Sequence, residues 1–494
     1  MSRILMTAGL MLLAATVKAQ VPGSGAALLV PADSRASRDS DVESLKLKVD
    51  QLQQALDRQN QLLLEMQRRL DELQGKSGAP SRAPEEVSLR ATPIEVAAKT
   101  TDATAVKQTR PEDKPPILAG WDGTRAFLRS PDGNFETQIG GYAQLDGRSY
   151  QSGNHPPNTF LVRRARLALE GRVYKYYEFR VEGDFADTAS TLLRDFYLNV
   201  HRIDEVQLRF GQFRVPYSQE EIRSDAYQDF VERSLVNNLV PSRSPGIAIQ
   251  GSINKGTFEY QLGAFNGKGL LATNTNGTPE TALRVRFSPW RSGQSFWTKG
   301  LSVGGAITQG RNLEGLSVRG QTESRSFTFF VPDSVNGKYY RANGELTWML
   351  GPAAIRVEYD QTNQRRDNLG TGGTNLPGVV AKGYTGQITY LLTGETKPEA
   401  GALTPKRNVF WDGSGESGFG AWELKFRYSN LQIADGTSKS NRAETFFFGP
   451  NWYLNRFVRY VMDFGFERFK DPLRTPNPGD RTFFVLLNRI QVAF

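Results

Sequence analysis

The chain has 494 residues, 61 basic and 52 acidic side chains, a formal net charge of +9 and no cysteine. The absence of cysteine excludes a disulfide framework and thiol catalysis. Only two histidines are present, His155 and His201, and no zinc, phosphate-loop or dinucleotide motif occurs. We therefore expect a protein that is not an enzyme, with no catalytic residue, no metal and no cofactor.

The N-terminus is predicted to be a secretory signal peptide over residues 1–19. A basic residue precedes an apolar run over residues 4–17, and the small residues Val17 and Ala19 precede the expected cleavage point. The run is too short for a transmembrane helix, which needs about 20 apolar residues. We expect the mature chain to leave the cytoplasm and to begin with a flexible, polar segment over residues 20–41.

Residues 42–74 carry a heptad repeat, which predicts a coiled coil. Nine of the ten seam positions over five heptads are apolar, and Gln59 is the polar one. A single amphipathic helix packed on a domain is the alternative. Residues 75–116 are rich in proline, alanine, threonine and charge, so we expect a linker there. The seam positions are Val42, Leu45, Val49, Leu52, Leu56, Gln59, Leu63, Met66, Leu70 and Leu73.

From residue 117 to the C-terminus, one strand pattern repeats. In "WELKFRYS", residues 422–429, aromatic and aliphatic side chains alternate with charged ones, so one face of the strand is apolar and the other is charged. Turn signals such as "NGKG" and "ADGTS" separate the segments. Sixteen strands are predicted, at approximately 135–150, 160–173, 175–187, 192–201, 205–214, 246–252, 256–266, 281–289, 299–309, 338–350, 352–361, 381–393, 419–430, 443–454, 456–469 and 479–494.

The gaps between these strands favour a single closed barrel. Short gaps alternate with long ones, such as 202–204 with 215–245, which is the loop pattern of transmembrane β-barrels. An array of soluble β-sandwiches would need several domains with composition breaks between them, and none is seen. The chain also ends on an aromatic residue, Phe494, in phase with an apolar strand face. We predict an all-β fold: a transmembrane antiparallel β-barrel of about sixteen strands over residues 117–494, preceded by a periplasmic coiled-coil helix.

The stretch "FLVRRARLALEGRVY", which begins at Phe160, shows which face lies inside. Arg164 and Arg166 share one face of the strand, and two leucines lie on the other. An arginine on the lipid face at mid-membrane costs about 2–4 kcal/mol, so we expect both arginines to face the lumen. Arg163 has the opposite parity and must lie at the rim of the barrel or at a β-bulge.

Residues 117–494 contain 34 arginines, 11 lysines and 37 acidic residues, a net charge of +8. Basic charge in a channel with low-dielectric walls concentrates anions, and rings of arginine select them. The alternative is that lumen arginines pair with lumen carboxylates and only stiffen the barrel. The candidate anion-binding and pore-lining residues are Arg164, Arg166, Arg180, Arg209, Arg284, Arg286 and Arg356.

Six motifs, in order, resemble the phosphate-selective porin O/P family: "FLVRRARLALEGRVYKYYEFRVEGDF", "LRDFYLNV", "LRFGQFRVPYSQEE", "LTGE", "WELKFRYSNL" and "NWYLNRFVRYVMDF". The resemblance covers about residues 117–494. It implies a sixteen-stranded outer-membrane barrel, usually a homotrimer, that passes small anions by diffusion through a constriction made by an arginine ladder and an inward-folded third loop. Arg163 and Arg164 match the family's paired arginines, and residues 216–221 match the start of the folded loop. The candidate constriction residues in that loop are Arg223, Arg233 and Arg243.

The third loop departs from the family pattern, because it has no lysine and carries Asp225, Asp229 and Glu232. A preference for anions is expected, whereas a preference for phosphate over chloride or sulfate is left open. We expect an outer-membrane porin that forms a water-filled, anion-selective diffusion channel of the phosphate or polyphosphate type. The alternative is a structural protein that tethers the envelope through its coiled coil, with a non-selective or closed barrel.

The expected partners follow from the interpretation as an outer-membrane porin. They are small phosphate-like anions as permeants, outer-membrane lipid and two further copies of the chain in a homotrimer. The expected location is the bacterial outer membrane, with the coiled coil in the periplasm, where it could contact the cell wall. No nucleic-acid partner is expected, because the basic residues of the exported barrel alternate with acidic ones.

Overall fold

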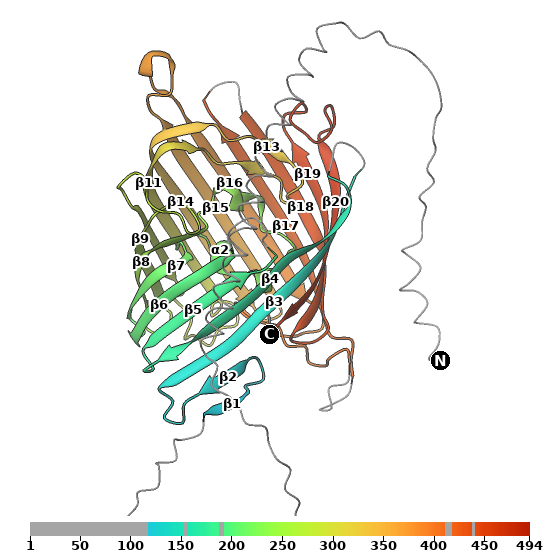
Figure 1. Ribbon diagram of the computed structural model, residues 1–494. Coiled ribbons are helices and arrows are strands. Elements are labelled where there is room, and N and C mark those ends of the chain that lie inside the picture. Colours follow the sequence, from blue (N-terminus) through green and yellow to red (C-terminus); the bar gives the residue numbers. More distant parts are fainter. Residues whose placement is uncertain (1–116, 152–155, 187–191, 411–416, 437–439) are drawn as a thin grey trace, which may run out of the picture. The chain divides into compact units, whose positions relative to one another are not determined.

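Sixteen antiparallel strands close into a β-barrel in the computed structural model, which describes residues 117–151, 156–186, 192–410, 417–436 and 440–494 (Figure 1). Each strand pairs with the next, and the last pairs with the first to close the ring. The predicted sixteen-stranded antiparallel barrel is confirmed, while the predicted signal peptide, flexible segment, coiled coil and linker lie outside the described residues. The barrel strands are β3 (Phe135–Tyr150), β4 (Thr159–Val173), β5 (Tyr177–Asp184), β6 (Leu193–Ile203), β7 (Val206–Arg214), β8 (Arg243–Ile253), β9 (Phe258–Phe265), β10 (Glu280–Phe287), β11 (Leu301–Leu316), β14 (Ser334–Leu350), β15 (Ala353–Arg366), β16 (Leu376–Leu391), β17 (Ala421–Ala434), β18 (Ser440–Tyr453), β19 (Val458–Phe469) and β20 (Thr482–Ala493).

The two faces of the barrel follow the alternation of the sequence. On β4, Arg164 and Arg166 are 5% and 6% exposed, whereas Leu167 and Leu169 are 48% and 42% exposed. Arginines that point inward and leucines that point outward are the arrangement that avoids the cost of charge in lipid. Large aromatic side chains, such as Phe160, are exposed on the outer surface, as in the aromatic girdles of outer-membrane barrels.

A β-bulge explains the tandem arginines at the start of β4. Gln144 of β3 pairs with Arg164, and the next residue of β3 pairs with Val162, so Arg163 is an extra residue in the ladder. Such a bulge reverses the parity of the strand locally. Arg163 therefore points inward like its neighbour, and its Nε donates to a carboxylate oxygen of Glu232 at 2.6 Å. The sequence allowed Arg163 to lie either at the rim of the barrel or at a β-bulge, and the structure shows the bulge.

The connections at one end of the barrel are mostly short. This end, called the turn end, also carries the C-terminus; the opposite end is called the loop end (Figure 1). One tight turn consists of residues 351–352, where Gly351 adopts a φ of 60° that favours glycine. Two turn-end connections are longer, residues 288–300 and residues 392–420. The described part of the second, residues 392–410, is called the inner segment, and it packs through Leu403 into an apolar cluster on β16–β18.

Two loop-end connections fill one side of the lumen. Residues 215–242, called the inward loop, contain the short helices α2 (Gln219–Ile222), η1 (Asp225–Tyr227) and η2 (Leu235–Leu239). The second connection contains a hairpin of β12 (Gly320–Gln321) and β13 (Thr328–Phe330). Apolar residues of η2 and of this hairpin pack against the inner faces of β14 and β16–β20. Among the described residues, no helix is long and apolar enough to cross a membrane. A further short element is η3 (Thr371–Gly373).

A small hairpin that the sequence did not predict lies at the turn end. Its strands, β1 (Leu118–Trp121) and β2 (Ala126–Arg129), extend the sheet, because β2 pairs with residues 136–139 of β3. β20 pairs with the rest of the same edge of β3, at residues 142–150. Both partners together cover this edge, so that few of its backbone groups are left unpaired.

Deletion of Phe494 is expected to lower the amount of folded barrel in the outer membrane. The backbone N–H of Phe494 donates to the carbonyl of Gly141 at 2.9 Å and its carbonyl accepts from Gly141 at 2.8 Å, so the last residue completes the closing ladder. The measurement is the fraction of heat-modifiable protein in outer-membrane extracts. An unchanged fraction would show that closure does not depend on this residue.

Candidate functional site

The inward loop is held inside the barrel by contacts of two kinds, polar contacts with β15 and apolar contacts with β18–β20. Ser218, which precedes α2, donates from its hydroxyl to Glu358 of β15 at 2.8 Å, and the backbone N–H of Glu220 donates to the same carboxylate at 2.8 Å. Further along, Phe230 and Val231 are buried in an apolar cluster on β18–β20. A loop with such apolar residues buries them inside the barrel rather than exposing them to water.

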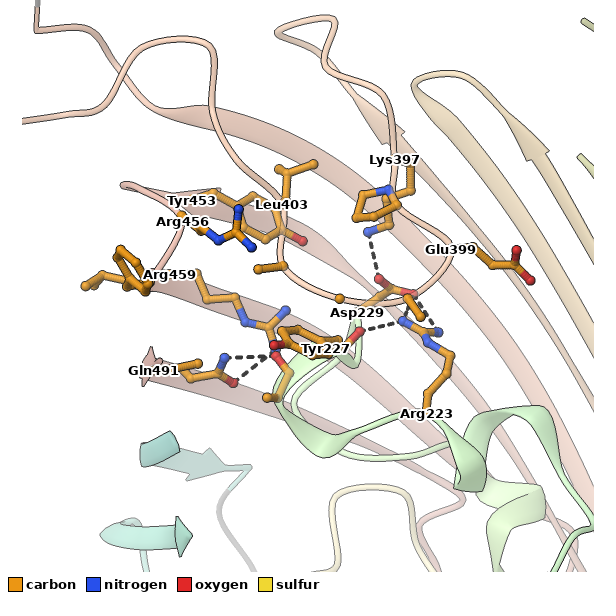
Figure 2. A pocket seen from close by; sticks show the side chains of 18 residues that line it. Arg223, Tyr227, Asp229, Lys397, Glu399, Leu403, Tyr453, Arg456, Arg459 and Gln491 are labelled. Carbon is orange, nitrogen blue, oxygen red and sulfur yellow. Dashed lines mark hydrogen bonds and ion pairs between the residues drawn. The ribbon is translucent and has the colours of Figure 1, made fainter. Parts of the chain in front are cut away.

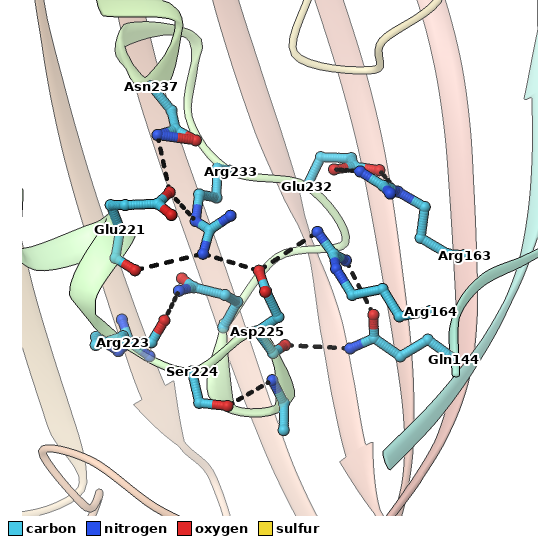
Figure 3. Close-up of polar contacts among 12 residues, drawn as sticks. Gln144, Arg163, Arg164, Glu221, Arg223, Ser224, Asp225, Glu232, Arg233 and Asn237 are labelled. Atoms are coloured by element: carbon cyan, nitrogen blue, oxygen red, sulfur yellow. Dashed lines mark hydrogen bonds and ion pairs between the residues drawn. The ribbon is translucent and has the colours of Figure 1, made fainter. Parts of the chain in front are cut away.

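An outer cavity of about 540 Å³ lies between the inward loop and the inner faces of β4–β6. Seven arginines and three carboxylates line it, so its lining has more positive than negative groups. Figure 3 shows Arg163, Arg164 and Arg233 of this lining. Guanidinium groups match the oxygen pairs of phosphate and carboxylate ligands. The charged lining residues are Arg163, Arg164, Arg166, Arg194, Arg233, Arg243, Arg325, Asp184, Glu221 and Asp225.

Asp225 holds four of the arginines around this cavity. Its carboxylate lies 2.8 Å from Arg166 and from Arg233, 3.3 Å from Arg164 and 3.4 Å from Arg214. Figure 3 shows the contacts with Arg164 and Arg233. Burial by itself would raise the pKa of Asp225, but the guanidinium groups hold that pKa well below its usual range. The carboxylate therefore stays ionised. Arg166 is also ion-paired with Glu182 and Asp184, and Arg233 with Glu221, so Asp225 is one of several carboxylates that share these arginines.

Arg180 of β5 and Arg209 of β7 lie on the inner face of the barrel and are not among the residues that line the outer cavity or the second cavity described below. Arg180 is ion-paired with Glu170 and Glu182. The guanidinium carbon of Arg209 lies 4.4 Å from the ring centre of Tyr197, a cation–π contact. In the part of the chain that the structure describes, no carboxylate lies within 4.0 Å of Arg209. Its charge is thus uncompensated at short range.

The second cavity, called the inner cavity, has a volume of about 780 Å³. It lies between the inward loop, the turn-end halves of β7–β10 and the inner segment. Five arginines and two glutamates line it, so the excess of positive charge continues toward the turn end. Its charged lining residues are Arg223, Arg284, Arg286, Arg291, Arg356, Glu259 and Glu399.

Asp229, near the middle of the inward loop, joins that loop to the inner segment (Figure 2). Its carboxylate accepts from Lys397 at 2.7 Å, from Arg356 at 3.0 Å and from Arg223 at 3.2 Å. Lys397 belongs to the inner segment and is also ion-paired with Glu423 of β17. Burial would raise the pKa of Asp229, but these three cations hold it well below its usual range. A loop from one end of the barrel and a segment from the other thus share one buried, charged junction.

All ten candidate arginines from the sequence lie on the inner face of the barrel or on the inward loop. Nine of them are ion-paired with a carboxylate, and Arg209 is the exception among the described residues. Their role in binding anions stays a prediction. The inward loop has no lysine of its own, but two lysines from other parts of the chain contact it. The Lys397 ammonium donates to the Asp229 carboxylate, and the Lys425 ammonium donates to the Asp229 backbone carbonyl at 2.8 Å.

The sequence did not single out the residues that the two long turn-end connections bring to the lumen. Arg291 lies in residues 288–300, and Lys397 and Glu399 lie in the inner segment. Neither connection shows strand alternation, so no periodic signal could have placed them inside. Of the two histidines, one lies outside the described residues, and His201 is hydrogen-bonded to Glu178 at 2.9 Å near the turn end.

Comparison with known proteins identifies the family. The family model "Phosphate-selective porin O and P" matches residues 137–494. The chain belongs to this family. It is therefore an outer-membrane porin. Porin O of Pseudomonas aeruginosa is 21% identical over 412 residues, which cover 74% of this chain and 90% of that protein.

Solved structures of several outer-membrane proteins also align with this porin at low identity. The trimer form of OmpT from Vibrio cholerae has a TM-score of 0.48 and 11% identity, over 72% of this chain and 99% of that one. The anion-selective porin from Comamonas acidovorans has a TM-score of 0.46 and 14% identity, over 72% and 99%. The channel DcaP of Acinetobacter baumannii has a TM-score of 0.48 and 11% identity, over 76% and 100%.

Proposed function

We propose that this porin passes small anions in preference to cations, and phosphate-like oxyanions in particular. The observation that carries the proposal is the surplus of guanidinium groups in both lumen cavities. Seven arginines face three carboxylates in the outer cavity, and five face two in the inner cavity. An anion on its way through the channel meets this surplus on both sides of the inward loop.

Electrostatics explains why the surplus matters although most arginines are ion-paired. The Debye length is about 8 Å at physiological ionic strength, so charges on the wall of a narrow cavity are only partly screened from an ion inside it. Low-dielectric walls strengthen the effect and raise the local concentration of anions. Arginine offers a planar fork that fits two oxygens of one ligand, which favours oxyanions over halides.

The proposal is tested by the zero-current potential of the purified porin in a planar bilayer with a KCl gradient. We expect the sign that corresponds to chloride flux exceeding potassium flux. The potential should collapse as the total salt concentration rises, because screening weakens the wall charges. A potential of the opposite sign would show that the acidic residues of the inward loop dominate and would overturn the proposal.

The proposal also includes the oligomeric state and the position of the N-terminal region. We propose a homotrimer, as the family resemblance implies, with residues 42–74 forming a coiled coil in the periplasm between the signal peptide and the barrel. The chain order supports the periplasmic position, because the barrel strands begin and end at the turn end, which faces the periplasm in outer-membrane barrels.

A further inference from the structure

Glu399 of the inner segment lines the inner cavity, where it meets Arg286 of β10 and Arg291 of the connection over residues 288–300. One of its carboxylate oxygens is ion-paired with Arg286, and the other lies 4.0 Å from Arg291. Its backbone carbonyl accepts from Arg356 at 3.4 Å. Two oxygens facing two guanidinium groups is the arrangement in which arginines hold an oxyanion.

The carboxylate of Glu399 is not a fixed part of the barrel wall. Its side chain is 39% exposed, and a Cβ placed on the nearby Gly401 would meet no atom within 4 Å, so the neighbouring backbone borders open space. By contrast, Glu259 pairs with the same Arg286 at 3.2 Å from the directly opposite position of the β9–β10 ladder. Arg286 would therefore keep a carboxylate partner if Glu399 moved away.

We propose that Glu399 is a tethered competitor for the oxyanion site formed by Arg286 and Arg291. Its carboxylate occupies the site in the empty channel, a passing oxyanion displaces it, and its return speeds the release of that oxyanion toward the turn end. This inference rests on the anion preference proposed above and names a residue that sets how tightly the inner cavity holds its ligand. A ligand must offer two oxygens to replace the carboxylate, so inorganic phosphate competes with Glu399 better than chloride does.

The test uses the full-length porin in planar bilayers, with chloride as the current carrier and inorganic phosphate as the blocking ligand. In the Glu399→Gln variant, the phosphate concentration that halves the chloride current should fall by about tenfold, because a tethered group competes at a high effective concentration. The matched control is Glu259→Gln, which removes the same charge from the same cavity. It should change the half-blocking concentration by much less.

Each other outcome overturns the inference. An equal shift in both variants would mean that only the net charge of the cavity matters, and an unchanged value in Glu399→Gln would mean that the carboxylate does not compete. Absence of block in the wild type and in the variant would mean that the oxyanion site does not exist. A cation-selective wild type in the KCl gradient would overturn the anion preference first, and this inference with it.

Glu399→Ala serves as a second variant, and heat-modifiable mobility verifies that each variant is folded. This variant should show the same fall in the half-blocking concentration, because it also removes the competing carboxylate. A fall in Glu399→Gln that is absent in a folded Glu399→Ala barrel would assign the effect to the new amide and would overturn the inference.

Discussion

The single-channel conductance is expected to rise severalfold when Asp229 is replaced by asparagine. Asp229 is 1% exposed, and its carboxylate is shared by Arg223, Arg356 and Lys397. The asparagine has nearly the same shape but no charge, so three cations would face one another without a counter-charge. Breaking a buried ion pair by removing one partner costs about 3–5 kcal/mol. The barrel ladder does not depend on this junction, so we expect the inward loop and the inner segment to separate and leave a wider lumen.

The measurement is the unit conductance in planar bilayers, together with the sensitivity of the inward loop to added protease. Asp367→Asn is the matched control, because Asp367, in the connection after β15, pairs at 3.1 Å with Arg365, whose side chain is 58% exposed. A surface ion pair contributes about 0–1 kcal/mol, so this variant should conduct like the wild type. If Asp229→Asn keeps the wild-type conductance in a correctly folded barrel, the apolar contacts of the inward loop hold it in place without the junction.

The barrel could be predicted from the sequence because each strand has one face in lipid and one in water. This contrast produces the period of two that marks all sixteen strands. The predicted ends of the strands differ from the observed ends where this contrast between an apolar and a polar face stops. β15 runs to Arg366, five residues beyond the predicted end, through the stretch "QTNQRR", which is polar on both faces. The part of a strand that extends beyond the lipid needs no apolar face, so the sequence there shows no alternation from which the strand could be predicted.

The electrostatic partners in the lumen could not be predicted from the sequence. The arginines and the acidic residues were visible, but Asp225 and Arg164 are brought together only when the inward loop crosses to β4. The same holds for Lys397 and Asp229, which lie 168 positions apart in the chain. The extra residue at Arg163 was visible as a break in parity, and only the pairing with β3 shows that it is a bulge.

These pairings change which arginine should matter most for selectivity. Arg166 lies within 3.3 Å of the carboxylates of Glu182, Asp184 and Asp225, so a glutamate in its place would leave those acidic groups without a cation and disturb the inward loop. An effect on permeation could then not be separated from an effect on the loop. Arg209 offers a cleaner test, because its described contacts are with the rings of Tyr197 and Phe213.

Replacing Arg209 with glutamate is expected to shift the anion-to-cation permeability ratio toward cations by about tenfold. Two unit charges 4 Å apart interact by about 1 kcal/mol in water and by about 4 kcal/mol at an effective dielectric constant of 20, and a hydrated lumen lies between these limits. A change of about 1.4 kcal/mol in the free energy of an ion at this position is a factor of ten. Arg209→Gln removes the charge without reversing it, so its shift should have the same direction and be smaller.

The ratio is obtained from the zero-current potential in a KCl gradient at low salt, where wall charges are least screened. Phe210→Leu is the control, because Phe210 is the next residue of β7 and is exposed on the outer face of the barrel. This variant should keep the wild-type potential. If a folded Arg209→Glu channel also keeps it, ions do not pass close to the wall of β6 and β7. The path would then follow the shared arginines around Asp225, whose combined charge would set the selectivity without any single arginine being essential.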